Sequence, residues 1–100
     1  MNLSNKQEYL SFKGKIIVDF YTDACMPCKV LKNIFEKVAS KNPNIRFAKC
    51  DVVANKEVAV EENITYVPHI KFYENGVFKG ETIGLLNEKQ LQEKIDLYYK

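Results

Sequence analysis

The chain has 100 residues, the length of a typical single domain, and 46% of them are hydrophobic, which is enough for one buried core. Its formal net charge is only +2 and its lysines are scattered, which argues against nucleic-acid binding. No apolar run is long enough to span a membrane, and residues 1–10 lack the apolar core of a secretion signal. Three cysteines are an odd number and too few for a disulfide scaffold, so we expect a cytoplasmic protein whose cysteines carry out chemistry.

The first predicted elements are a short helix and a strand. Ser4 can cap a helix that runs to about Phe12, and residues 1–3 are predicted to form a short edge strand before it. Residues 16–21 form a nearly continuous apolar run, which is typical of a strand covered on both faces. We therefore expect other elements to pack on both sides of this strand.

A longer helix and a second strand follow. After Cys25, apolar residues recur at helical spacing, and they are Val30, Leu31, Ile34, Phe35 and Val38. Pro27 is tolerated in the first turn of this helix, and the Asn-Pro-Asn sequence at residues 42–44 ends it. Residues 45–50 alternate between apolar and polar side chains and predict a strand. The strand, helix and strand should form a right-handed βαβ unit with parallel strands.

The next segment predicts a short helix and a hairpin. Asn55 can cap a helix over about residues 56–62. The Asn75-Gly76 pair predicts a hairpin over residues 69–83, because a type I′ turn needs positive φ at both central positions.

The last segment predicts a helix with a defined start. Asn87 and Gln90 form a capping-box pair, and the apolar stripe behind them consists of Leu91, Ile95 and Tyr98 or Tyr99. The order of elements predicts an α/β fold in which helices flank a mixed sheet on both faces. No linker or repeat interrupts the chain, so residues 1–100 are predicted to form a single domain.

Two cysteines stand where the first long strand gives way to the longer helix. Cys25 and Cys28 lie at this junction, where the free N–H groups and the dipole of a helix favour a reactive thiolate. The C-x-x-C spacing alone also fits half of a zinc site or a pair of buried thiols. A closed zinc site needs four ligands, and the remaining soft ligands, Cys50 and His69, are not spaced as a pair. We therefore predict no metal.

Two charged residues interrupt predicted strands. Asp19 lies in the most apolar strand, where a buried carboxylate is costly unless it is used, and Lys49 lies on the neighbouring parallel strand. One interpretation is a strand end whose carboxylate reaches solvent or a cation. The other is a buried acid whose raised pKa allows proton transfer near neutral pH, with Lys49 as its partner.

Three further residues admit two interpretations each. Pro68 is either an ordinary trans proline at a strand start or a cis proline that exposes the backbone of Val67 to an extended peptide. His69, the only histidine, is either a half-buried strand residue or a group close enough to the cysteines to stabilise a thiolate or carry a proton. Cys50 is either a small buried apolar residue or a regulatory thiol.

Together these residues resemble the thioredoxin family. The family pattern Val-Asp-Phe-Trp-Ala-x-Trp-Cys-Gly-Pro-Cys-Lys is matched within residues 18–29 at Val18, Asp19, Phe20, Cys25, Pro27, Cys28 and Lys29. Lys49 lies 19 residues before Pro68, which is the family's spacing between a buried lysine and a cis-proline. The turn at residues 75–76 and Gly84 also match, so the resemblance extends from about Leu3 to the C-terminus.

The chain also departs from the family pattern around the cysteines. Tyr21 and Ala24 replace the two family tryptophans, Met26 replaces the glycine between the cysteines, and His69 replaces the threonine after the proline. The resemblance implies that Ala24 and Met26 contact the substrate. It also implies that Met26, Pro27 and His69 tune the reduction potential of the cysteine pair.

The resemblance implies a thioredoxin fold and protein-disulfide reduction. Cys25 would attack a substrate disulfide, and Cys28 would resolve the mixed disulfide that results. Asp19 would accept the proton of Cys28, with Lys49 tuning Asp19. The substrate backbone would bind at Val67–Pro68.

The resemblance also implies disulfide-containing protein substrates, a separate reductase as electron donor, no bound cofactor, and a monomer. Nucleic acid and membrane are not expected as partners. Two alternatives remain open. The first is a non-catalytic interaction or redox-sensing module on the same scaffold, which the missing tryptophans and Met26 favour. The second is an oxidase or isomerase of an oxidising compartment, and the reduction potential separates these possibilities.

Overall fold

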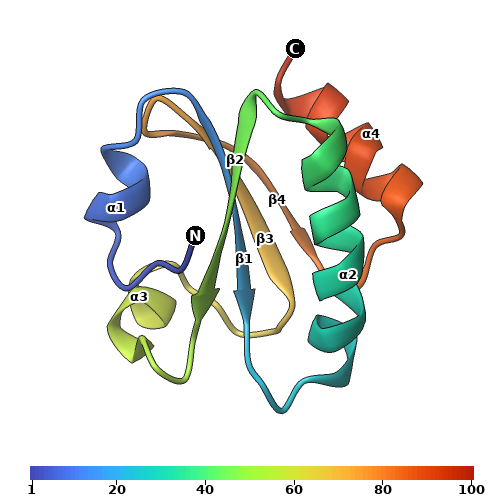
Figure 1. Cartoon of the computed structure of the whole chain (residues 1–100). Coiled ribbons are helices and arrows are strands. Elements are labelled where there is room, and N and C mark those ends of the chain that lie inside the picture. Colours follow the sequence, from blue (N-terminus) through green and yellow to red (C-terminus); the bar gives the residue numbers. More distant parts are fainter.

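A computed structural model describes residues 1–100 as one mixed sheet with helices on both faces (Figure 1). The sheet has the strand order β2-β1-β3-β4, with β1 parallel to β2 and antiparallel to β3, and with β3 antiparallel to β4. The strands are β1 Lys15–Tyr21, β2 Ile45–Asp51, β3 His69–Glu74 and β4 Val77–Ile83. The helices are α1 Gln7–Leu10, α2 Met26–Lys41, α3 Lys56–Glu61 and α4 Glu88–Tyr98. No helix is long and apolar enough to cross a membrane.

The two faces of the sheet carry separate hydrophobic cores. Helices α2 and α4 cover one face, and α1 and α3 cover the other (Figure 1). Ile17 and Ile70 lie in the core under α2 and α4, whereas Val18 and Phe20 lie in the core under α1 and α3. Successive residues of β1 therefore point to opposite faces. All five central residues of β1 are buried, which confirms the expectation of a strand covered on both sides.

The N-terminal segment differs from the sequence prediction. The first helix is a single turn, Gln7–Leu10, and Ser4 does not cap it. The hydroxyl and backbone N–H of Ser4 instead donate to the Glu8 carboxylate, while the Asn5 side chain accepts from the Glu8 N–H. Residues 1–3 form only one bridge to β2, between Asn2 and Lys49, rather than a strand. The carboxylate of Glu8 satisfies the N–H groups that a longer helix would have left free.

The second predicted cap was also wrong. The side chain of Asn55 does not cap α3, which ends at Glu61. Its amide donates instead to the backbone carbonyls of Asp51, at 3.0 Å, and Leu3, at 3.4 Å. A side chain with two competing backbone acceptors nearby cannot be assigned to a cap from sequence alone.

The last helix begins as predicted. Asn87 and Gln90 form a reciprocal capping box, with N–H to side-chain oxygen distances of 3.0 and 2.8 Å. Leu91, Ile95 and Tyr99 are buried against the sheet, whereas Tyr98 is half-buried with its ring beside Phe72. These contacts hold α4 on the same face as α2.

The hairpin turn offers a direct test of the fold. Asn75 and Gly76 have φ angles of 51° and 80°, as a type I′ turn requires, and a Cβ at Gly76 would collide with the carbonyl oxygen of Leu10. We expect Gly76→Ala to lower the free energy of unfolding by more than the ~1–2 kcal/mol cost of a left-handed residue alone. Gly84→Ala is the matched control, because Gly84 has φ +94° but no atom within 4 Å of an added Cβ. Chemical denaturation of both variants decides the point, and equal losses would exclude a role for the collision.

Candidate active site

The two cysteines lie at the start of α2. Cys25 is the N-cap residue, and its Sγ accepts a hydrogen bond from the Cys28 N–H at 3.1 Å. The two residues are joined by a disulfide, with their Cα atoms 5.2 Å apart. Cys28 is only 4% exposed, whereas Cys25 is half-buried. A reacting partner can therefore reach Cys25 more readily than Cys28, and the helix start stabilises negative charge on the Cys25 sulfur.

A second segment faces the same sulfur atom. The Val67–Pro68 peptide bond is cis, which the sequence suggested only through the family resemblance. The Cys25 Sγ lies 3.7 Å from the carbonyl oxygen of Val67. The predicted substrate-binding segment and the predicted nucleophile are therefore neighbours, although 42 residues separate them in the chain.

Asp19 is a buried acid on β1. Its side chain belongs to the face covered by α2, it is 4% exposed, and its Oδ1 atom has no hydrogen-bond partner. Burial raises the pKa of Asp19 from 3.8 to about 7, and the positive charge of Lys49 offsets part of that rise. The carboxyl group can therefore take up or release a proton near neutral pH.

Lys49 lies directly beside Asp19 in the sheet. The two residues are paired in the parallel register of β1 and β2. They form no ion pair within 4 Å, and the Lys49 Nζ lies 5.7 Å from the centre of the Tyr21 ring. Lys49 therefore affects Asp19 through its electric field rather than through a hydrogen bond.

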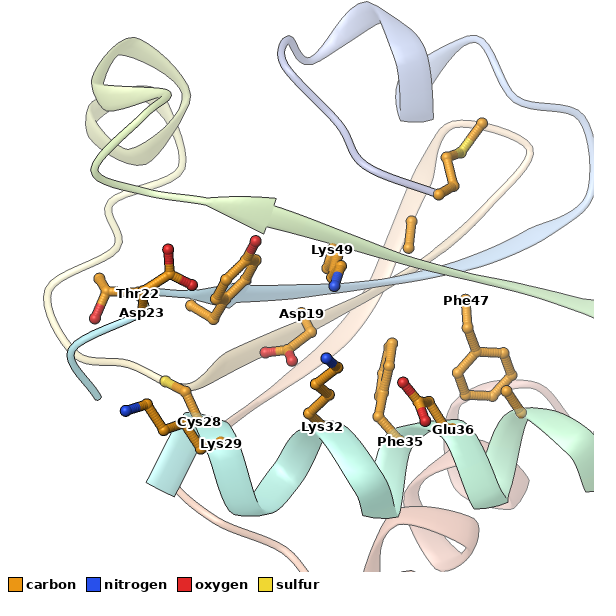
Figure 2. A pocket seen from close by; sticks show the side chains of 14 residues that line it. Asp19, Thr22, Asp23, Cys28, Lys29, Lys32, Phe35, Glu36, Phe47 and Lys49 are labelled. Carbon is orange, nitrogen blue, oxygen red and sulfur yellow. The ribbon is translucent and has the colours of Figure 1, made fainter. Parts of the chain in front are cut away.

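Asp19 and Cys28 line the same cavity (Figure 2). This cavity has a volume of about 300 Å³ and lies between the sheet and α2, with Lys49 on the sheet side and Lys32 and Glu36 on the helix side. A space of this size with polar groups in its wall can admit water. A water-mediated path between the Cys28 sulfur and the Asp19 carboxyl group is therefore compatible with the geometry.

His69 lies apart from this cavity. Its side chain is buried and packs edge-on against Phe20, in the core under α1 and α3, and its Nε2 atom lies 2.7 Å from Oε1 of Glu81. The structure therefore pairs His69 with a glutamate of β4 rather than with a cysteine. Its only direct link to the site is through Pro68, the preceding residue, and its role in redox tuning stays a prediction.

Cys50 is buried under α1 and α3, as the small-apolar interpretation predicted. Burial, followed by the negative charge of Asp51, raises the pKa of its thiol to about 11, which disfavours the reactive thiolate. No group of three or more histidine, cysteine, aspartate or glutamate side chains could hold a metal ion.

Exposed apolar side chains surround the cysteine pair, and sequence reasoning found only one of them. Met26 follows Cys25, and Tyr66 precedes Val67. A hydrogen bond of 2.8 Å from the Gly84 N–H to the Pro68 carbonyl brings residues 83–85 to the same edge, and Ile83 and Leu85 are exposed there. The sequence places Ile83 at the end of the predicted hairpin and Leu85 just beyond it, where local patterns contain no signal of a shared surface.

Comparison with known proteins agrees with this geometry. The family model named Thioredoxin matches residues 2–97. The chain belongs to the thioredoxin family. It is 36% identical to a thioredoxin of Mycoplasmoides gallisepticum, in an alignment that covers 92% of this chain and 95% of that protein.

Two solved structures are similar along nearly the whole chain. Oxidised mitochondrial thioredoxin 3 from Saccharomyces cerevisiae has a TM-score of 0.87 and 30% identity, over 96% of this chain and 92% of that one. A structure described as the basis of the thiol-resolving mechanism in yeast mitochondrial 1-Cys peroxiredoxin via glutathione/thioredoxin systems has a TM-score of 0.88 and 29% identity, with the same coverage. The predicted thioredoxin fold is thereby confirmed.

Family membership also confirms the predicted class of activity. Members of the thioredoxin family are protein-disulfide oxidoreductases that act without a bound cofactor, on disulfide-containing proteins and with a reductase partner. The Cys25–Cys28 pair of this chain is the redox-active disulfide of a thiol-disulfide oxidoreductase.

Proposed function

We propose that this member of the thioredoxin family reduces disulfides in proteins, with Cys25 as the nucleophile and Cys28 as the resolving thiol. The observation that carries the assignment is the position of the pair, with Cys25 as the N-cap of α2 and Cys28 buried behind it. The Cys25 thiolate attacks one sulfur of the substrate disulfide, and the other substrate sulfur leaves as a thiolate that takes a proton from solvent. The Cys28 N–H, which donates to Cys25 Sγ, stabilises the attacking charge.

The mixed disulfide binds along the segment next to Cys25. The backbone of Val67 lies beside the Cys25 sulfur and can pair with an extended peptide, while Pro68 fixes the direction of the chain. Ala24 and Met26, the chain neighbours of Cys25, are exposed and can contact side chains of the substrate. With alanine in place of the family tryptophan, apolar contact at this site depends more on Met26 and on Tyr66.

Resolution of the mixed disulfide needs a proton acceptor for Cys28. Asp19 lines the same cavity as Cys28, and its pKa of about 7 allows it to accept that proton through water. The deprotonated Cys28 then attacks Cys25 Sγ and releases the second substrate sulfur as a thiolate. This step forms the Cys25–Cys28 disulfide. Lys49 stabilises the ionised form of Asp19 and so keeps more of the carboxyl group in the form that can accept a proton near neutral pH.

The expected partners follow from this cycle. A separate reductase must return two electrons to the Cys25–Cys28 disulfide, and the chain itself supplies no bound cofactor. We propose that it works as a monomeric single domain in the cytoplasm, without nucleic acid or membrane as a partner. The buried free thiol of Cys50 supports a reducing compartment, and the scattered lysines speak against a nucleic-acid partner.

Reduction of insulin by dithiothreitol, with the protein as catalyst, tests the proposal. We expect catalysis, together with a Cys25–Cys28 reduction potential close to the cytosolic glutathione poise, roughly −320 to −220 mV. A pair that cannot be cycled would support a non-catalytic binding module instead. A much less negative potential would support an oxidase or isomerase.

A further inference from the structure

A buried charged cluster lies on the face of the sheet opposite Asp19. It comprises Tyr9 of α1, Glu62 just after α3, and Lys71 and Tyr73 of β3, and we call it the Glu62 clasp. Lys71 Nζ donates to the backbone carbonyl of Glu62 at 2.7 Å and lies 3.3 Å from its Oε1 atom. The hydroxyls of Tyr9 and Tyr73 both donate to the Oε2 atom of Glu62.

Burying the charges of Glu62 and Lys71 costs free energy, but hydrogen bonds within the Glu62 clasp satisfy them. Burial alone would raise the pKa of Glu62, but the hydrogen bonds from Tyr73 and Tyr9 and the charge of Lys71 hold it below its usual value. Glu62 and Lys71 are each 8% exposed. A buried ion pair adds little stability compared with apolar residues of similar size. Its best-supported role is to hold the chain in one specific arrangement.

The segment between Glu62 and Lys71 contains the proposed substrate-binding backbone. Residues 65–67 lie outside any helix or strand, and none of their N–H groups donates to another backbone group. Thr65 and Tyr66 are also exposed and only Val67 is half-buried, so little side-chain packing and no backbone N–H pairing hold this stretch along its length. Its position therefore depends on its two flanks. On one side the buried Pro68 leads into β3, and on the other lies the turn from Glu62 to Ile64, where the Ile64 N–H donates to the Ala59 carbonyl at 2.9 Å.

We propose that the Glu62 clasp positions residues 65–67 against Cys25, so that Glu62 and Lys71 are positioning residues for binding of the substrate peptide. Lys71 lies three residues after Pro68 and bonds to the carbonyl of Glu62, which closes the base of the loop that carries Val67. Neither charged residue contacts the cysteines. This inference rests on the proposed reduction of protein disulfides.

The test uses the double variant Glu62→Gln/Lys71→Met. Glutamine keeps an acceptor for both tyrosines, and methionine keeps the apolar stem, so no unpaired charge stays buried. We expect KM for a protein disulfide such as insulin to rise roughly tenfold, the effect of about one charge-assisted hydrogen bond. The rate with a small aromatic disulfide, which needs no backbone pairing, should change less than about twofold, and the reduction potential should stay the same. The NMR order parameters of the backbone amides of residues 65–67 should fall, because the segment becomes more mobile.

Three further variants complete the test. Lys71→Arg keeps the charge and the donors, so its KM should equal that of the unaltered protein. Lys56→Met removes an exposed charge on α3 and should not change KM. Tyr73→Phe removes one hydrogen bond to Glu62 but keeps the ion pair, so it tests the clasp even if the double variant does not fold. We expect it to raise KM about two- to threefold.

The outcomes separate this inference from the proposed function. An unchanged KM in the variants, or equal losses with the protein and the small disulfide, would overturn the positioning role. If the unaltered protein reduced no protein disulfide, the proposed function would fail first. The backbone order parameters of residues 65–67 would then still report whether the Glu62 clasp holds the segment, because that readout needs no substrate.

Discussion

Cys25→Ser is expected to abolish disulfide reduction, whereas Cys28→Ser is expected to trap the substrate as a mixed disulfide. Cys25 is the sulfur that a substrate can reach, and without it no attack begins. Cys28 is buried behind it. In the proposed cycle it acts only in the second step, so its loss should stop the cycle after the first bond has formed. Turnover with insulin and mass spectrometry of the accumulated adducts measure the two effects.

Cys50→Ser is the matched control for this pair of variants. Cys50 is a buried free thiol on the opposite face of the sheet, so its removal should leave the turnover rate unchanged. The absence of an adduct in Cys28→Ser, or residual turnover that is equal in the two active-site variants, would contradict the assigned roles.

Asp19→Asn is expected to stabilise the protein at pH 8 much more than at pH 4. Burial raises the pKa of Asp19 from 3.8 to about 7, so between these values the unfolded chain is ionised while the folded protein holds the proton. The slope of stability against pH is then negative, and stability is lost as pH rises from about 4 to about 7. The gain from asparagine at pH 8 should therefore exceed the gain at pH 4 by roughly 4 kcal/mol. Denaturant unfolding at the two pH values measures this difference.

Asp23→Asn is the control for the stability measurement, because Asp23 is an exposed acid at the rim of the same cavity. It should show no comparable dependence on pH. In the insulin assay, Asp19→Asn should slow turnover while the fold stays intact, since the variant cannot accept the Cys28 proton. An unchanged turnover rate would remove Asp19 from the mechanism, even if its effect on stability is observed.

Much of the fold could be predicted from the sequence because its signals are local. The apolar run of β1, the helical spacing after Cys25, the Asn75-Gly76 turn and the capping box of α4 each lie within one element, where periodicity and turn chemistry apply directly. Alternation along two adjacent strands also sufficed to pair Asp19 with Lys49.

The features that the sequence did not reveal depend on contacts between distant segments. Ser4 and Asn55 have good capping side chains, but each bonds to a different group that folding brings near. Lys71 and His69 alternate with apolar residues in the ordinary way of a strand, so nothing in the pattern of β3 predicts that Glu62 and Glu81 become their partners. For such residues the sequence shows which side chains can bond but not which of them meet, because the folded sheet brings the partners together.

The position of the Cys25 sulfur at the N-cap of α2 lowers the structural change needed to switch between the oxidised and reduced states. Sulfur accepts the Cys28 N–H in the disulfide state, and a thiolate at the same position is an even better acceptor. The first turn of the helix therefore needs no new partner when two electrons arrive or depart. We expect the oxidised and reduced backbones to superimpose closely, so that the rearrangement in each cycle is confined to the sulfur atoms, the water near them and one proton.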